Sequence, residues 1–188
     1  SDLAINIINS PSGKVNQLNN ALKLVPDDSL VLVTDADALI DNKMGLINAV
    51  EILTIPKVGL VGGWTMPHDG TALPAEIAFW DKQNRMRYME MVCFSSSIVV
   101  APFYLFKKQL IMEFPEDCVA DDVYVSLQSH LKNLKVIYSP DILVTEMRSP
   151  KTYKSLFLHK LRKSNAYVIE LLRIAYKIPY MGKRLSIM

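Results

Sequence analysis

Two carboxylates one residue apart follow an apolar run in the sequence. Asp35 and Asp37 come after the run at residues 30–33, whose β-branched side chains predict a strand covered on both faces. Ligands of open α/β sheets collect at the carboxyl ends of such strands. Paired carboxylate oxygens suit Mg²⁺ or Mn²⁺, which take further ligands from phosphate and water. We therefore expect a divalent-cation site at these residues; a pair of solvated turn residues is the alternative.

Two further charged motifs lie where helices are predicted to begin. Lys14 follows Gly13 and opens an amphipathic stretch over residues 15–25, so it places a cation at a helix N-terminus, where anions bind. Asp121 and Asp122 open a stretch that is predicted to be helical to Lys132. Adjacent like charges push their titrations apart, which favours one of these acids as a general base. A double N-terminal cap is the alternative.

The elements that must position these residues alternate in α/β style. Further helices are predicted over residues 41–53, 75–91, 103–112 and 151–178, and further strands over residues 58–63, 96–100 and 136–138. Residues 64–74 are predicted to form an open loop, and Pro140 is predicted to stop the last strand. The pattern favours a mixed, mostly parallel sheet flanked by helices.

Composition narrows the class of protein. The 188 residues suit one domain, and 50% hydrophobic residues exclude a disordered chain. No run of ~18 apolar residues is present, and the start at Ser1 resembles no signal peptide. The missing initiator Met indicates a processed chain or a fragment. Two cysteines, Cys93 and Cys118, predict free thiols in a reducing compartment.

Charge divides the chain into an acidic body and a basic end. Residues 1–150 hold 12 Lys and Arg against 18 Asp and Glu, whereas residues 151–188 hold nine against the single acid Glu170. We therefore expect a core over 1–150 and a basic amphipathic helical extension over 151–188. Its apolar stripe comprises Tyr153, Leu156, Phe157, Leu161, Ile169, Leu172 and Tyr176.

This extension predicts an anionic partner, and a peripheral contact with a membrane surface is one expectation. The alternative is a stripe that packs onto the sheet. A homo-oligomer is left open. Nucleic acid is not expected, because no base-stacking motif accompanies the basic residues.

The motifs, taken in order, resemble family 2 glycosyltransferases with the GT-A fold. Gly13-Lys14, Leu18-Asn19 and Ala21-Leu22 precede Thr34-Asp35-Ala36-Asp37, which matches the Asp-x-Asp motif of that family. Asp121-Asp122 stands where the family has a Glu-Asp pair, and residues 136–140 stand where a strand ends in Tyr-x-Pro. The agreement extends over residues 8–165. The resemblance implies a partial GT-A fold.

The resemblance also implies roles for these residues. Asp35 and Asp37 would hold the Mg²⁺ or Mn²⁺ and the donor diphosphate, and Lys14 would contact the donor nucleotide. Asp122 would be the catalytic base that deprotonates the acceptor hydroxyl. Asp121, beside it, replaces the commoner Glu.

Two departures from the family pattern qualify the resemblance. Of the Gln-x-x-Arg-Trp motif only Arg162 matches, within His159-Lys160-Leu161-Arg162-Lys163, and Arg162 is expected to bind the donor. Loss of the Gln and Trp favours transfer of one sugar, or few, over processive synthesis. The nucleotide-binding first strand of the family should precede Ala4, so the chain is expected to lack the N-terminal part of the domain.

The function that the resemblance implies is that of a metal-dependent, inverting, non-processive glycosyltransferase. It would move a sugar from a UDP- or GDP-sugar to a hydroxyl of a glycan or lipid-linked acceptor, in the cytoplasm or at the inner face of the cell membrane. One alternative is a haloacid-dehalogenase-type phosphatase with Asp35 as nucleophile and Asp37 as acid, although Leu39 stands where that family has Thr or Val. Another is a non-catalytic domain that binds an anionic surface.

Overall fold

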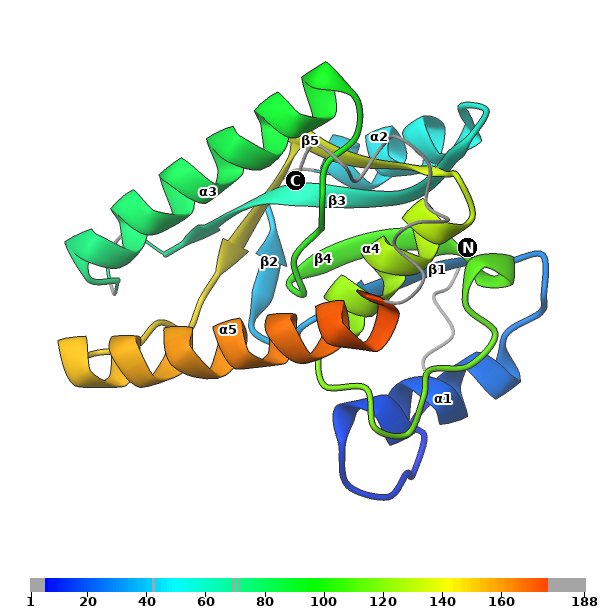
Figure 1. The fold of residues 1–188 in the computed structure, drawn as a ribbon, viewed down its shortest axis with the longest axis horizontal. Helices are drawn as coiled ribbons and strands as arrows, with labels where there is room; N and C mark the ends of the chain where they lie inside the picture. The colour runs from blue at the N-terminus through cyan, green and yellow to red at the C-terminus, as the bar shows by residue number, and fades with distance from the viewer. Residues whose placement is uncertain (1–5, 42, 69, 71, 176–188) are drawn as a thin grey trace.

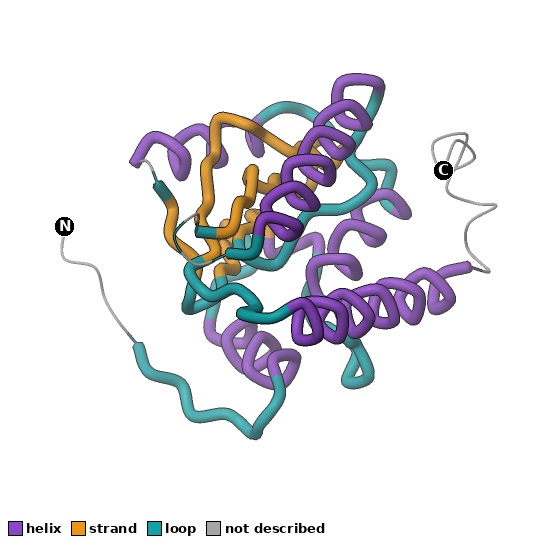
Figure 2. Tube along the Cα trace, turned by 90° about the vertical axis from the view of Figure 1, so that its left-hand side faces the viewer, coloured by secondary structure: helices purple, strands orange, loops and turns teal. Residues whose placement is uncertain are grey.

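A five-stranded sheet with helices around it forms the centre of the molecule (Figures 1 and 2). The structure is a computed structural model and describes residues 6–41, 43–68, 70 and 72–175. Its elements are α1 (Lys14–Leu24), β1 (Leu30–Thr34), β2 (Ala38–Ile40), α2 (Lys43–Thr54), β3 (Val58–Pro67), α3 (Pro74–Cys93), β4 (Phe103–Lys107), a 3₁₀ turn (Lys108–Leu110), α4 (Asp121–Leu131), β5 (Lys135–Glu146) and α5 (Tyr153–Ile174).

The strands lie in the order β1-β4-β3-β5-β2. This confirms the predicted mixed sheet flanked by helices, but among these strands only β3 and β5 run parallel; the other neighbours are antiparallel. Residues 30–33 form β1, an edge strand whose first residue is exposed; Val31 and Val33 pack into the core on one face of the sheet and Leu32 into the core on the other, as expected for a strand covered on both faces. β1 and β2 form opposite edges of the sheet, yet only residues 35–37 connect them.

Strand β4 explains how the core is divided between the two faces of the sheet. Tyr104 and Phe106 lie in a cluster with side chains of α1 and α4, whereas Phe103 and Leu105 lie in a second cluster with side chains of α2. All four are at most 2% exposed. Helices therefore cover both faces of the sheet, as the α/β pattern requires.

Two predicted elements in the middle of the chain are wrong. Residues 103–112, predicted as a helix, form β4 and the 3₁₀ turn. Residues 96–100, predicted as a strand, form a loop with one isolated β-bridge, between Val100 and Phe103. In this loop the Ser126 hydroxyl accepts from the Val99 N–H at 3.0 Å. Side-chain hydroxyls often replace ladder partners in this way.

Two predicted strands are longer than expected. β3 continues to Pro67 through residues that were predicted to form a loop, because residues 64–67 pair with residues 143–146 of β5. Gly62, within β3, serves close packing: a Cβ there would lie 2.5 Å from Val99 Cγ1. β5 continues past Pro140, where the register with β3 shifts. A bulge accepts a proline that a regular ladder would exclude.

The long predicted helix near the end of the chain is α5, which packs against α4. Its Glu170, which is 0% exposed, accepts a hydrogen bond from the Val119 N–H at 2.8 Å and pairs with Arg173 at 2.9 Å. Arg173 also pairs with Asp117 at 2.7 Å. These contacts hold α5 against the segment that precedes α4. The predicted domain boundary at residue 150 stays a prediction.

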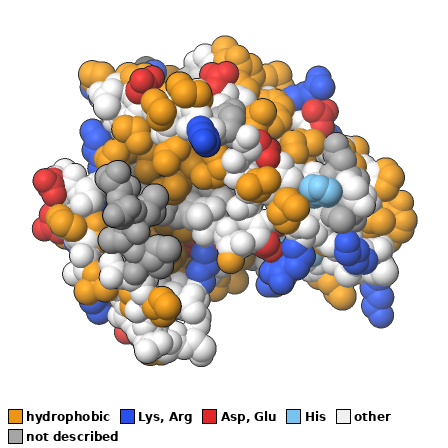
Figure 3. All heavy atoms as spheres, turned by 180° about the vertical axis from the view of Figure 1, so that it is seen from behind, with side chains coloured by type: hydrophobic (Ala, Val, Ile, Leu, Met, Phe, Trp, Pro, Cys, Tyr) orange, Lys and Arg blue, Asp and Glu red, His pale blue; other side chains and the backbone are white. Residues whose placement is uncertain are grey.

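Apolar side chains reach the surface in several places. On the face seen from behind they alternate with charged side chains (Figure 3). Cys93 is exposed and Cys118 buried, and both are free thiols. Over the ranges that the structure describes, no helix is both long and apolar enough to cross a membrane.

Candidate active site

Lys14 joins two of the predicted motifs at one point. Its Nζ lies 3.2 Å from Asp35 Oδ1 and 3.1 Å from Asp121 Oδ2. Gly13 makes this possible, because its φ of 111° lies in the region that favours glycine and lets α1 begin at Lys14. Burial alone would lower the pKa of Lys14, but the carboxylates of Asp121 and Asp35 hold it above its usual value.

Asp121 has a second partner that the sequence did not indicate. The Tyr104 hydroxyl, on β4, donates to Asp121 Oδ2 at 2.5 Å. Tyr104 is 0% exposed and Asp121 7% exposed. Burial and the Asp121 carboxylate raise the pKa of Tyr104 well above its usual value, so the phenol stays a donor. Asp121 is thus held from two sides, by an ammonium and a phenol.

Asp122 lies beside this group but has a different environment. Its Oδ1 accepts from the Val123 N–H at 2.9 Å, and its carboxylate forms no ion pair within the described part of the chain. Burial, followed by the Asp121 charge, raises the pKa of Asp122 to about 6; Lys14 and Lys163 oppose that rise. The helix begins at Asp121 after Ala120, so neither acid is the N-cap. A carboxylate whose pKa lies near 6 is suited to accept a proton.

Asp35 and Asp37 flank the tight turn between β1 and β2. Asp37 Oδ2 lies 3.0 Å from Arg148 Nε, and its backbone carbonyl accepts from the Met147 N–H at 2.8 Å. The side chains of Asp35 and Asp37 are 33% and 29% exposed. The structure therefore brings Lys14, Asp35 and Asp121 into contact, with Asp37 two residues further along the same turn.

The side chains of Asp35 and Asp37 are of the chemical type that binds a divalent cation. Both offer hard oxygen ligands that solvent can reach. Across the described ranges, no three His, Cys, Asp or Glu side chains gather as a metal site. The chain would supply two ligands, and phosphate or water oxygens the rest. Lys14 and Arg148 would then share their carboxylates with the ion.

Three residues near the site were not predicted from the sequence. Tyr104 and Arg148 belong to no recognised motif, and only the fold brings them to the aspartates. Glu146, at the end of β5, is the third: burial raises its pKa, with Lys163 opposing and Asp37 adding to the rise. Tyr104 and Glu146 are embedded in apolar strands, so their sequence neighbours give no sign of chemistry.

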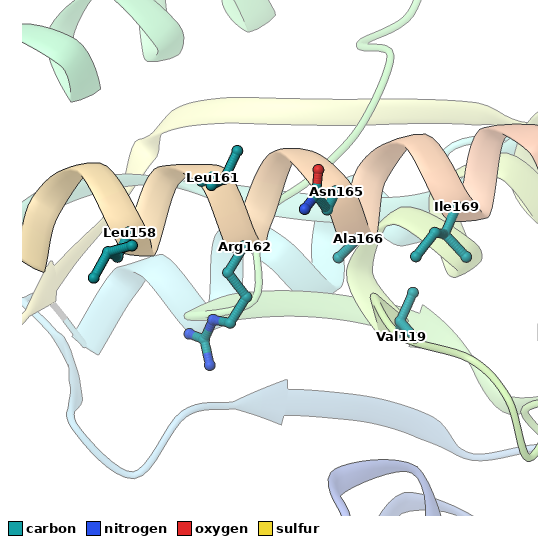
Figure 4. A pocket seen from close by; sticks show the side chains of 7 residues that line it. All are labelled: Val119, Leu158, Leu161, Arg162, Asn165, Ala166 and Ile169. Carbon is teal, nitrogen blue, oxygen red and sulfur yellow. The ribbon is translucent and has the colours of Figure 1, made fainter.

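Arg162 lies on α5 and lines a groove of about 430 Å³. The groove is lined by Val119, Leu158, Leu161, Arg162, Asn165, Ala166 and Ile169. Figure 4 shows Arg162 extending away from the helix, while Ala166 and Ile169 lie beside Val119. Within the described residues, Arg162 makes no ion pair with Asp35 or Asp37, which pair with Lys14 and Arg148 instead.

Comparison with sequences gives a distant similarity. No protein-family model matches the chain. A poly-beta-1,6-N-acetyl-D-glucosamine synthase from Staphylococcus aureus is 25% identical over 162 residues, which cover 80% of this chain and 37% of that protein. The chain thus spans little more than a third of this relative.

Comparison with solved structures gives a stronger similarity. A mannosyltransferase from Pyrobaculum calidifontis, in complex with GDP-Man and Mn²⁺, superposes with a TM-score of 0.69 at 25% identity, over 88% of this chain and 44% of that chain. Glucosyl-3-phosphoglycerate synthase from Mycobacterium tuberculosis, in complex with Mn²⁺, UDP and glucosyl-3-phosphoglycerate, has a TM-score of 0.53 at 17% identity, over 88% and 56%. The second similarity concerns the fold alone.

Proposed function

We propose that this chain, which has the fold of GT-A glycosyltransferases, carries the catalytic site of a family 2 enzyme that transfers a sugar from a nucleotide-sugar to an acceptor hydroxyl. The observation that carries the proposal is the bridge of Lys14 between Asp35 and Asp121. It unites three motifs that are far apart in sequence. The mannosyltransferase that resembles the chain was solved with GDP-Man and Mn²⁺, which supports a nucleotide-sugar donor.

The donor end of the site is assigned to the turn between β1 and β2. Asp35 and Asp37 would hold Mg²⁺ or Mn²⁺, whose charge neutralises the departing diphosphate. Lys14, at the start of α1, places an ammonium and a helix N-terminus toward the donor. Arg162 adds a guanidinium from α5 for the donor phosphates.

The acceptor end is assigned to the start of α4. Asp122 takes the proton from the acceptor hydroxyl as that oxygen attacks the anomeric carbon, and the bond from that carbon to the diphosphate breaks on the opposite side. Attack and departure on opposite sides invert the configuration at the anomeric carbon. Asp121, held by Lys14 and Tyr104, keeps a second charge beside Asp122 and so raises its basicity. One sugar, or few, is transferred per acceptor.

The phosphatase alternative is less well supported. It assigns the chemistry to Asp35 and Asp37 alone and gives no role to Asp121 and Asp122, which lie at the same site. Asp35 is also held by Lys14 at 3.2 Å. We therefore favour the transferase.

The test of the donor site is calorimetric titration of UDP and of GDP, with Mn²⁺ and with EDTA. Binding is expected only with the metal, and Asp37→Asn is expected to abolish it. Asp28→Asn, at an exposed residue in the turn before β1, is the matched control and is expected to bind normally. Equal binding in EDTA, or normal binding by Asp37→Asn, would contradict the assignment. A non-catalytic domain would bind neither nucleotide.

We further propose that α5 touches an anionic membrane surface at the cytoplasmic face. Of the predicted stripe, Leu156 is buried, Tyr176 lies outside the described residues, and the others are exposed: Tyr153 66%, Phe157 67%, Leu161 46%, Ile169 47% and Leu172 68%. The stripe is therefore not packed onto the sheet. Basic residues of the same segment complement anionic lipid.

Sedimentation with vesicles tests this contact. Binding to phosphatidylserine vesicles is expected to exceed binding to phosphatidylcholine vesicles, and to fall at high salt. Phe157→Ser with Leu172→Ser should weaken it, whereas Leu39→Ser, at an exposed apolar residue of β2, should not. Equal binding to both lipids would refute the membrane contact, and a dimer in sedimentation equilibrium that the double variant dissociates would assign the face to a second copy.

A further inference from the structure

The first turns of α3 meet the middle of α5 beside the proposed acceptor end. Lys160 Nζ lies 3.7 Å from Glu76 Oε1 and 3.8 Å above the centroid of the Phe79 ring. Lys163, nearly one helical turn further along α5, lies 5.4 Å above the Trp80 ring, and Lys160 lies 5.1 Å from the same ring. Two cations thus cover Trp80, which is not free to stack on a neutral sugar ring.

Lys163 is the cation at this junction that is most available to a ligand. Its side chain is exposed, and it forms no ion pair with any residue that the structure describes. Tyr167, about one helical turn further along α5, packs in one cluster with Val123, the residue after Asp122, so this part of α5 lies beside the proposed base. The Lys163 charge accordingly opposes the rise in the pKa of both Asp122 and Glu146. An exposed ammonium that no carboxylate neutralises is placed to bind an anionic group of a molecule whose hydroxyl reaches the proposed base.

The floor of the junction holds polar atoms that lack partners in the described part of the molecule. Glu76 Oε2 and Trp80 Nε1 are buried and form no hydrogen bond there. Glu76 is 2% exposed and Trp80 3% exposed. Buried polar groups without partners are uncommon and call for an explanation, such as a water or a ligand group. One is an acceptor and the other a donor, which is the combination that a hydroxyl group satisfies.

We propose that the α3–α5 junction binds an anionic group of the acceptor, so that the acceptor is a hydroxylated molecule that also carries a phosphate or carboxylate. Lys163, with Lys160 behind it, binds the anion, while Asp122 receives the hydroxyl that is to be glycosylated. The donor diphosphate is assigned to Asp35, Asp37, Lys14 and Arg162, which leaves Lys163 for the acceptor. This inference rests on the proposed function and narrows its acceptor to an anionic class.

The test uses the full chain and small probes, by calorimetry in saturating UDP and Mn²⁺. The probes are sn-glycerol 3-phosphate, glycerate and neutral glycerol. The phosphate and the carboxylate are expected to bind more tightly than glycerol, and the better of the two identifies the anion. Lys163→Gln is expected to lower the affinity for the more tightly bound anion about tenfold, because it removes one charge-assisted contact.

Lys154→Gln is the matched control, since Lys154 is exposed on the same helix outside the junction. It should leave all three probes unaffected, and thermal unfolding should show that both variants fold. Equal binding of glycerol and the anions, or no effect of Lys163→Gln on the anions, would overturn the proposal. Weaker UDP binding by Lys163→Gln would instead assign Lys163 to the donor. Failure of UDP to bind the unaltered chain would count against the proposed function itself, separately from anion binding.

Discussion

Replacing Asp122 by Asn should make the protein more stable while removing the proposed transferase activity. The pKa of Asp122 is raised from 3.8 to about 6 by burial and by Asp121. At 1.36 kcal/mol per pKa unit, this corresponds to a loss of about 3 kcal/mol in the free energy of unfolding when the carboxyl ionises in the folded state. Asn keeps the size and the carbonyl oxygen that accepts from the Val123 N–H, but carries no charge.

The sign of the pH dependence follows from the direction of the shift. Because the folded pKa is the higher one, the folded chain holds this proton more tightly than the unfolded chain between about pH 4 and pH 6. The contribution of Asp122 to stability therefore falls as pH rises through that window and is constant above it. Asp122→Asn should gain up to about 3 kcal/mol over the unaltered chain at pH 7.5 and nothing below about pH 4.

Urea unfolding from pH 4 to pH 8 measures this difference, with Asp28→Asn as the control at an exposed acid. Sugar transfer by the full-length protein should fall about 10²–10⁴-fold in Asp122→Asn, and transfer by the unaltered enzyme should rise with pH through about 6. A variant that is less stable at pH 7.5, or a difference that does not change with pH, would refute the electrostatic reasoning. Near-normal transfer would remove Asp122 from the mechanism.

Three other substitutions test separate contacts. Lys14→Met removes the bridge to Asp121 and should cost about 1 kcal/mol in urea unfolding and weaken UDP binding; Lys14→Arg should retain most of both. Glu170→Gln loses a buried charge that holds α5 and should cost about 1–3 kcal/mol, measured in the same way. Gly62→Ala forces a Cβ against Val99 and should lower the free energy of unfolding by about 1–3 kcal/mol; an unchanged midpoint would contradict the tight packing.

Motifs with polar residues at strand and helix ends were predictable from the sequence. Gly13 and Lys14 mark a helix start by backbone freedom and charge, and Asp121 follows a short loop and opens an amphipathic run. Each of these signals is local, so the helices α1 and α4 were predicted to within about one residue of their observed bounds. The order of these motifs along the chain, which is similar to that in family 2 glycosyltransferases, then indicated that they belong to one site.

Elements buried on both sides were not predictable in this way. β4 is apolar at every position from Phe103 to Phe106, since alternate side chains enter different clusters. Such a strand has no period of two, and its pattern can be mistaken for a helix. Tyr104 was missed for the same reason: the sequence shows an aromatic residue in an apolar run, and only the sheet brings its hydroxyl to Asp121.

The short connection between the two edge strands also affects how the molecule opens. β2 has three residues and pairs with the end of β5, so its release requires far less energy than unfolding of the whole sheet. Because residues 35–37 are all that joins it to β1, each release of β2 pulls directly on Asp37 and its bond to Arg148. We therefore expect the ion pair between Asp37 and Arg148 to persist only while β2 stays paired with β5. Amide hydrogen exchange of residues 38–40 would report the lifetime of that pairing directly, and an ion that binds both aspartates would lengthen it.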